Sequence, residues 1–235
     1  MKIEVARIKE LCRERLDLKG ARLGPEYYYM SLPLCVIDAV YSISIRYSMT
    51  YQIVINFCEK YKLCRLREIG SEHPPITDQL SISDCLDRLS GQSGLELAEN
   101  VFRSKHRTST QNGILKSEAV VAFLEVIRNN GIDYYQDLSA ENEGMIKAPI
   151  QSIPGQKSGI SLKYFLMLAG RDNYLKPDRM IQRFVVTAVG KPVTIKQAES
   201  LLKAAYEELV DEYPSLTLRE LDHVIWNYQR NLRTP

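Results

Sequence analysis

The chain has 235 residues, 45% hydrophobic and 26% charged, so it is long and apolar enough to bury a core and is not a disordered chain. Its 31 Lys and Arg residues nearly balance 29 Asp and Glu residues, and the formal net charge of +2 neither indicates nor excludes a nucleic-acid partner. Since no apolar run approaches the roughly 20 residues that span a bilayer and the first segment mixes both charge signs, we expect a soluble, cytoplasmic protein without a membrane partner.

The hydrophobic periodicity is helical along nearly the whole chain, and strand-like alternation of useful length is hard to find. The sequence therefore predicts an all-α protein. The expected helices are, in chain order, 3–16, two within 31–63, 81–89, 95–102, 115–128, 145–153, 160–170, one that begins after Pro177, 195–209 and 218–228.

Several of these helices have recognisable ends. Ser31, which precedes Pro33, is a reasonable helix start. Thr194 is a candidate cap, and Thr217 with Glu220 three residues later forms a capping box. The stretch 68–78, which contains His-Pro-Pro, cannot continue a helix and is expected to be a loop.

Cysteine and histidine spacing gives no metal signature. The five cysteines form no CxxC pair and the three histidines are scattered, so we expect reduced structural thiols and no metal held by side chains. The densest basic cluster of the first half, Arg103, Lys105, His106 and Arg107, precedes Gly113.

The segment Ile153–Phe184, IPGQKSGISLKYFLMLAGRDNYLKPDRMIQRF, resembles the signature of the helix-hairpin-helix DNA glycosylases, such as endonuclease III and the alkyl-base glycosylases. In that signature an apolar-Pro-Gly hairpin joins two helices, and a catalytic Asp follows in an apolar setting. The matching parts are the hairpin from Ile153 to Gly159, the second helix Ser161–Ala169, and Asp178.

The resemblance extends to the flanks and covers roughly Pro33 to Asn231. The matching flanks are 32–51, 113–122, 194–213 and 218–229. It implies a two-lobe fold with a six-helix lobe at 25–170, which ends in the hairpin motif, and a second helical lobe from 1–24 plus 171–235. DNA is expected in the cleft between the lobes.

The hairpin is expected to grip a DNA phosphate. Glycines allow close backbone approach, and amides at the start of a helix carry partial positive charge. The residues concerned are Gly155, Gln156, Lys157, Ser158 and Gly159. The resemblance also implies a monovalent-cation site at the backbone of Ile153 and Gly155. The competing interpretation is a plain glycine-rich turn between helices.

Asp178 is the candidate catalytic residue by the same resemblance. A carboxylate facing a flipped nucleotide can stabilise the oxocarbenium-like sugar and orient the attacking water. Alternatively, Asp178 follows Pro177 at a helix start, where an aspartate is a common N-cap. One side chain can fill both roles.

Two departures from endonuclease III restrict the expected chemistry. The nucleophilic lysine of the glycosylase-lyases falls on Gly159, between Lys157 and Lys163, so we expect a monofunctional, water-using enzyme without AP lyase activity. The C-terminal segment lacks the four cysteines that bind an iron-sulfur cluster in endonuclease III, so we expect no cluster and no other cofactor.

The residues that meet the base are harder to assign. Relatives insert a side chain into the duplex from an early turn; here Ser44 is too small, which leaves Arg46 or Tyr47. The candidate base pocket comprises Asp38, Tyr41, Tyr164 and Trp226. A carboxylate within an apolar stretch needs a partner, and Asp38 is expected either to line this pocket or to pair with Arg46.

These features predict a monomeric DNA N-glycosylase of base-excision repair, cytoplasmic and nucleoid-associated, that acts on a damaged or mismatched base in double-stranded DNA. Arg103, Lys105 and Arg107 are expected to add phosphate contacts. Two alternatives stay open: a non-catalytic DNA-binding protein of the same fold, and a helical interaction protein with no nucleic-acid role.

Overall fold

The computed structural model describes residues 2–232 of the chain. Within this range the chain forms eleven α-helices, three short 3-10 turns and no strand beyond two isolated bridges, Tyr29 with Leu66 and Arg107 with Leu115. The all-α prediction is therefore confirmed.

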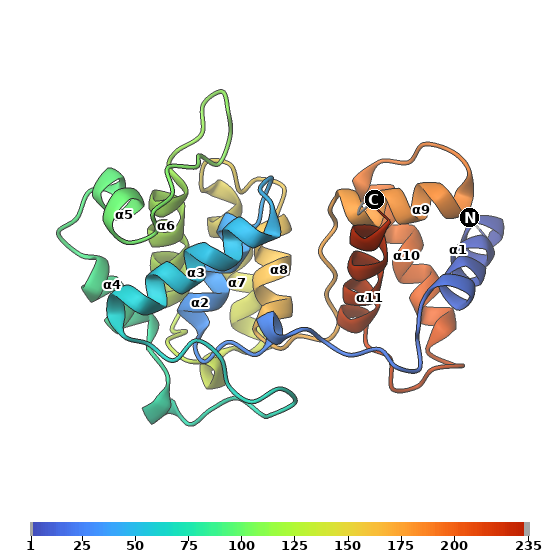
Figure 1. Cartoon of the computed structure of the whole chain (residues 1–235), viewed down its shortest axis with the longest axis horizontal. Helices are drawn as coiled ribbons and strands as arrows, with labels where there is room; N and C mark the ends of the chain where they lie inside the picture. The colour runs from blue at the N-terminus through green and yellow to red at the C-terminus, as the bar shows by residue number, and fades with distance from the viewer. Residues whose placement is uncertain (1, 233–235) are drawn as a thin grey trace. The chain divides into compact units, whose positions relative to one another are not determined.

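The helices group into two compact units. In Figure 1 the colour follows the residue number, so each segment of a unit can be found by its colour. The central unit comprises Pro25–Ala169, and the terminal unit comprises residues 1–24 together with 170–235. Seven described α-helices lie in the central unit, whereas the family resemblance implied six: α2 (Leu32–Tyr41), α3 (Tyr47–Tyr61), α4 (Ile82–Leu89), α5 (Gly94–Asn100), α6 (Lys116–Asn129), α7 (Ala140–Ser152) and α8 (Ile160–Leu168).

Helix α2 forms the centre of the central unit, because all 10 of its residues are buried. Helices α3, α6 and α8 pack around it. A helix that is apolar on every side belongs in a protein interior, where it contacts several other helices at once. Asp38 is the one charged residue on α2, and it is 1% exposed. This helix therefore places a buried carboxyl group at the centre of the core of this unit.

The terminal unit is built from both ends of the chain. Its helices are α1 (Lys2–Arg15), α9 (Arg179–Val189), α10 (Ile195–Leu209) and α11 (Leu218–Asn231). Helix α1 packs against α9 and α10, and α11 packs against α9. Ile8 of α1 joins Phe184, Leu202 and Leu221 in one fully buried cluster. The N-terminal helix thus completes a core that the C-terminal segment supplies.

Local capping chemistry sets most helix ends. Thr217 Oγ1 accepts from Glu220 N at 3.1 Å while Glu220 Oε2 accepts from Thr217 N at 2.9 Å, which confirms the predicted capping box. The prediction for α7 began too late, at residue 145, because Ser139 starts this helix through a box with Asn142 instead of the usual Glu or Gln. Only the C-terminal half of α7 had a clear apolar pattern.

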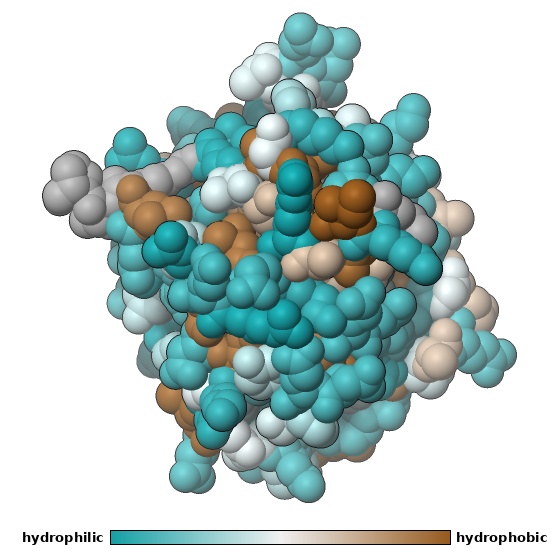
Figure 2. All heavy atoms as spheres, turned by 90° about the vertical axis from the view of Figure 1, so that its right-hand side faces the viewer, coloured by the Kyte–Doolittle hydropathy of each residue, from teal (hydrophilic) through white to brown (hydrophobic). Residues whose placement is uncertain are grey.

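No helix within the described range is long and apolar enough to cross a lipid bilayer. Figure 2 shows a face of the molecule that is mostly hydrophilic, with apolar side chains in small separate groups. Scattered exposed apolar residues are normal for a protein surface. This face therefore gives no sign of an extended apolar docking surface.

We predict that Phe165→Ala destabilises the central unit by about 3–5 kcal/mol, the usual cost of emptying an aromatic site in a core. Phe165 is fully buried on α8 and meets the Phe123 ring edge-on at 5.5 Å between centroids. Urea unfolding followed by circular dichroism would measure the loss. The control is Leu95→Ala, because Leu95 is 50% exposed. A loss below about 1 kcal/mol for Phe165→Ala would contradict this account of the core.

Candidate nucleic-acid interface and carboxylate site

The predicted hairpin forms a tight connection between α7 and α8. Gln156 N donates to Ile153 O at 2.9 Å, and Gly159 N donates to Gln156 O at 2.9 Å. Gly159 is the N-cap residue of α8, and its backbone has a left-handed φ of 70°. Gly159 has no side chain to cap the helix, and Ser158 Oγ accepts a hydrogen bond from Ile160 N at 3.4 Å. The first amides of α8 therefore follow directly on the hairpin, as anion binding at a helix N-terminus requires.

Both hairpin glycines are required by their surroundings. A Cβ on Gly155, whose φ is +85°, would lie 2.3 Å from Cβ of Thr108. A Cβ on Gly159 would lie 2.8 Å from Nε2 of Gln151. The left-handed φ strains any larger residue at both positions, and at Gly155 the contact with Thr108 leaves no room for a Cβ. The contact with Thr108 also shows that the hairpin lies directly against the basic segment that precedes α6.

The hairpin residues differ in what they can offer a ligand. Lys157 and Ser158 are exposed. Gln156 is 3% exposed, and its Oε1 accepts a hydrogen bond from Ser161 Oγ. Its side chain therefore holds the hairpin to α8, and its backbone N–H and C=O are already bonded within the hairpin. The carbonyl of Ile153 already accepts one N–H and keeps one lone pair, so the monovalent-cation site at Ile153 and Gly155 stays a prediction.

The basic segment before α6 is held in a defined loop. Thr108 N donates to Ile114 O at 2.9 Å, which closes the loop. Arg103, Lys105 and Arg107 are all exposed. Lys105 pairs with Glu99 at 2.6 Å, and Arg107 Nη1 donates to Gly113 O at 2.8 Å. Lys105 and Arg107 thus have local partners, and all three cations remain exposed to solvent.

Lys116 joins this loop to the turn between α2 and α3. It is 2% exposed, and its Nζ donates to Tyr41 O at 2.8 Å and also to Ile43 O. Its backbone N donates to His106 O at 2.8 Å. Sequence reasoning missed this role. The available signal was a lysine in the first turn of a helix, where the helix dipole disfavours a cation.

The turn between α2 and α3 exposes one of the two residues predicted to insert into the duplex. Ser44 has a left-handed φ of 61°, and Arg46 is exposed at the N-cap position of α3. Tyr47 is partly buried; burial, and after it the carboxylate of Glu26, raises the pKa of the Tyr47 hydroxyl. Since that hydroxyl is hydrogen-bonded to Glu26, Arg46 is the more accessible of the two candidates for insertion into the duplex.

The turn, the basic loop and the hairpin therefore belong to one connected surface of the central unit, named here the basic face. Its members are residues 42–46, 103–108 and 155–159. In Figure 1 these three segments lie along the same side of this unit, before α3, α6 and α8. Lys116 and the contact of Thr108 with Gly155 connect them. Five exposed cations gather there: Arg46, Arg103, Lys105, Arg107 and Lys157.

The structure divides the predicted base-pocket residues. Asp38 accepts a hydrogen bond from the Tyr29 hydroxyl at 2.9 Å, a partner that the sequence did not suggest. Tyr164 lies in the same cluster, since burial, and after it Asp38, raises the pKa of Tyr164 well above its usual value. Tyr41 is fully buried against Phe102, with ring centroids 5.3 Å apart. These residues all belong to the central unit.

Trp226 belongs instead to the terminal unit, on α11. Its ring stacks on His223, with centroids 6.3 Å apart, and Arg230 lies over it at 4.6 Å. His223 in turn contacts Asn227 at 2.9 Å between Nε2 and Nδ2. These contacts give Trp226 a structural role on α11 and do not group it with Asp38, Tyr41 and Tyr164.

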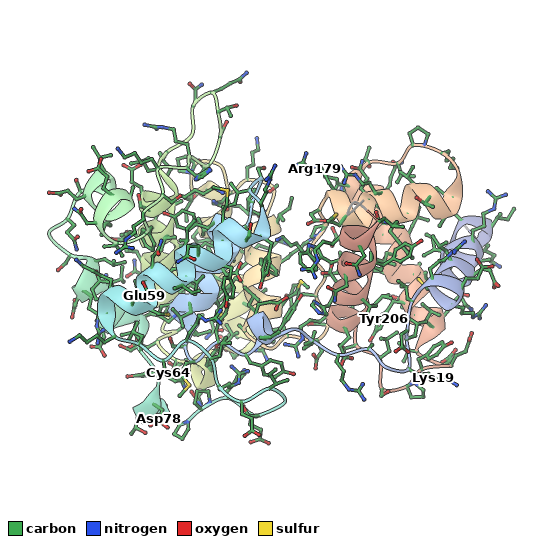
Figure 3. All side chains as sticks on the ribbon, viewed as in Figure 1. Lys19, Glu59, Cys64, Asp78, Arg179 and Tyr206 are labelled. Carbon is green, nitrogen blue, oxygen red and sulfur yellow. The ribbon has the colours of Figure 1, made fainter. Side chains whose placement is uncertain are left out.

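Asp178 caps α9. Its Oδ1 accepts from Met180 N at 2.7 Å and from Ile181 N at 3.4 Å, and the side chain is partly buried. Figure 3 labels the next residue, Arg179, at the start of this helix. The capping interpretation is therefore confirmed, and it fixes the direction of the carboxylate. Capping uses Oδ1, which leaves Oδ2 for another partner.

A second carboxyl lies close to Asp178. Asp222 on α11 is 5% exposed, and its Oδ1 accepts from Lys176 N at 2.9 Å. Burial, and after it the charge of Asp178, raises the pKa of Asp222 well above its ordinary value. Sequence reasoning missed Asp222. The signal was an acid placed among the apolar positions of α11, next to Leu221.

No group of three or more His, Cys, Asp or Glu side chains within residues 2–232 is arranged to hold a metal ion.

Residues 6–230 match the model of a family described as a domain of unknown function, DUF8548, and the chain belongs to that family. No curated protein and no solved structure matches the chain.

We predict that Lys116→Met destabilises the central unit by about 1.5–3 kcal/mol, since a buried cation bonded to two carbonyls is lost and those acceptors stay buried. The measurement is the free energy of unfolding in urea. The matched control is Lys147→Met, an exposed helical lysine whose loss should change stability by less than about 0.5 kcal/mol. Equal effects of the two substitutions would show that Lys116 does not connect the turn to the loop.

Proposed function

We propose that this member of the DUF8548 family is a monofunctional DNA N-glycosylase with a helix-hairpin-helix glycosylase-like fold, acting on a damaged or mismatched base in double-stranded DNA. The observation that carries the proposal is the basic face. Three segments that the sequence predicted separately to contact DNA, two by the resemblance and one by its cluster of basic residues, are joined in one unit by Lys116 and by the contact of Thr108 with Gly155.

The basic face suits a DNA backbone better than a small anion. The cations lie on three different segments, and their side chains are exposed. A duplex carries one negative charge per about 1.7 Å of its axis, so several cations on one surface can contact several phosphates. The start of α8, where Gly159 provides no capping side chain, adds backbone N–H groups that would contact a phosphate without reading sequence. Such a surface supports binding that is strong at low salt and independent of sequence.

Asp178 is assigned the chemical step in the proposal. When the bond between C1′ and the base nitrogen breaks, its electron pair leaves with the base and the sugar becomes an oxocarbenium ion. A carboxylate beside C1′ stabilises this cation and accepts a proton from the water that adds to C1′. The product is an abasic site. The cap on α9 supports this role, because it holds the Asp178 carboxylate in one orientation.

The same residues argue for hydrolysis instead of lyase chemistry. A lyase needs an amine to form a Schiff base with C1′. The position that the resemblance aligns with that amine is Gly159, which is buried and has a left-handed φ that a lysine would rarely adopt. Water is therefore the proposed nucleophile.

We predict that Asp178→Ser abolishes base removal while leaving the fold intact. Serine also caps helices, so the variant removes the carboxylate and keeps an acceptor for Met180 N. The rate of abasic-site formation should fall by about 10²–10⁴-fold, the range for loss of a general base. Alkali cleavage of duplex oligonucleotides, each with one damaged or mismatched base, would measure it.

Asp178→Ala is the companion variant, because it loses both the cap and the carboxylate and should also cost about 1 kcal/mol of stability. Full activity in the serine variant would refute catalysis by Asp178. Absence of abasic product from every duplex with the wild-type protein, together with intact DNA binding, would favour a non-catalytic DNA-binding protein of this fold.

We predict that Lys157→Ala weakens duplex binding equally for all sequences. Each lost phosphate contact should reduce the slope of log Kd against log salt by about 0.9. Fluorescence anisotropy of a labelled duplex at several salt concentrations would measure the slope. Lys60→Ala removes an exposed lysine outside the basic face and is the control. An unchanged slope for Lys157→Ala would exclude the hairpin from the DNA contact.

A further inference from the structure

In the terminal unit, the segment between α8 and α9 is hydrogen-bonded to α11 at two points. Arg219 N donates to Asp172 O at 3.2 Å, and their side chains form an ion pair at 2.7 Å. One turn later on α11, Asp222 accepts from Lys176 N at 2.9 Å. Asp178 N donates to Lys176 O at 2.8 Å. The peptide groups of Lys176 thus link the buried Asp222 to Asp178.

The carboxyl groups of Asp178 and Asp222 therefore lie at the same turn. The hydrogen bonds that form this turn come from backbone N–H groups and not from an arginine. Buried groups avoid charge unless they are paired. Two nearby carboxyls cannot both ionise without repulsion, so such pairs tend to hold one proton. Asp222 is 5% exposed, whereas Asp178 is partly exposed and accepts hydrogen bonds from two helix amides.

We propose that Asp222 is the positioning residue for Asp178: it carries the single proton of this carboxyl pair and, through Lys176, holds the turn that presents the Asp178 carboxylate. The proposal rests on the catalytic role assigned to Asp178. As a neutral acid, Asp222 keeps its acceptor for Lys176 N and adds no second negative charge beside Asp178. Ionisation of Asp222 would repel Asp178 and disturb this turn.

The other charged groups near Asp222 act more weakly. Burial and Asp178 raise the pKa of Asp222, while the Lys176 amide and the Lys176 charge oppose them without restoring the ordinary value. Arg219 is engaged by Asp172, and the imidazole of His223 contacts Asn227. Burial therefore sets the protonation state, and Asp178 reinforces it.

The sign of the pH dependence follows from this state. The pKa of Asp222 is raised in the folded protein, so the unfolded chain releases this proton first as the pH rises. At a pH above the ordinary aspartate pKa of about 3.9, the folded state therefore loses stability relative to a protein without this carboxyl. The loss grows until the pH passes the raised pKa.

The test is the equilibrium constant of unfolding of the full chain in urea, measured from about pH 4 to about pH 8. Asp222→Asn keeps the acceptor for Lys176 N and cannot ionise, so unfolding at about pH 7 should become at least about tenfold less favourable, the equivalent of one pKa unit. Near pH 4 the variant and the wild type should agree. Asp172→Asn, on the same segment but exposed, is the control and should show no such gain.

Coupling between the two carboxyls is tested by a double-mutant cycle. In an Asp178→Asn background the repelling charge is absent, so the gain from Asp222→Asn at about pH 7 should shrink by a measurable factor. Additive effects, or no gain from Asp222→Asn at any pH, would overturn the proposal. Asp222→Leu removes the acceptor as well and should destabilise at every pH, which separates loss of the hydrogen bond from loss of the proton.

Activity provides the second readout. The wild-type rate of abasic-site formation should fall on the alkaline side as Asp222 ionises, and Asp222→Asn should remove that alkaline limb while retaining activity. An unchanged alkaline limb in Asp222→Asn would refute the positioning role. If the wild type forms no abasic product at any pH, the proposed glycosylase function fails, whereas the unfolding cycle still decides whether Asp178 and Asp222 are coupled.

Discussion

Helix α2 has no side that faces solvent, so each polar group on it must find its partner within the protein. Asp38 accepts a hydrogen bond from the Tyr29 hydroxyl, and the carbonyl of Tyr41, like that of Ile43 in the following turn, accepts one from the Lys116 ammonium. The Tyr41 hydroxyl, by contrast, is buried without a hydrogen-bond partner among the residues that the structure describes. A cation at the C-terminal end of a helix is also favoured by the helix dipole. The buried helix thereby determines where α6 begins and which way the turn before α3 runs.

This arrangement explains why the basic face is part of the fold and not an accident of surface composition. The net charge of the chain is only +2, so affinity for a polyanion has to come from local placement of cations. Lys116 supplies none of that surface charge, because it is 2% exposed. It instead fixes the segments that carry Arg46 and the loop cations, and Gly155 fixes the hairpin against the same loop.

The two carboxyls of the terminal unit are likewise held by backbone groups, in this case by N–H donors. Asp178 is held by the amides at the start of α9, and Asp222 is held by the amide of Lys176. A cap orients a side chain as well as stabilising a helix, so structural and chemical roles can coincide in one residue. In this protein the carboxylate proposed for the chemical step is also the one that begins α9, and a buried acid on α11 is bonded to the turn before it.

The sequence alone determined what depends on near neighbours: the helical class, the cap at Thr194, the capping box at Thr217, the cap at Asp178 and the glycines of the hairpin. It could not determine that the Gln156 side chain turns inward or that Asp38 pairs with Tyr29. Lys116 and Tyr41 are 75 residues apart, and Lys176 and Asp222 are 46 apart. Periodicity and capping patterns report interactions within about one or two helical turns, whereas a buried charge is satisfied by whichever group the packed chain brings to it. Only the tertiary structure decided those partners, because desolvation makes a distant partner necessary without specifying in the sequence where it lies.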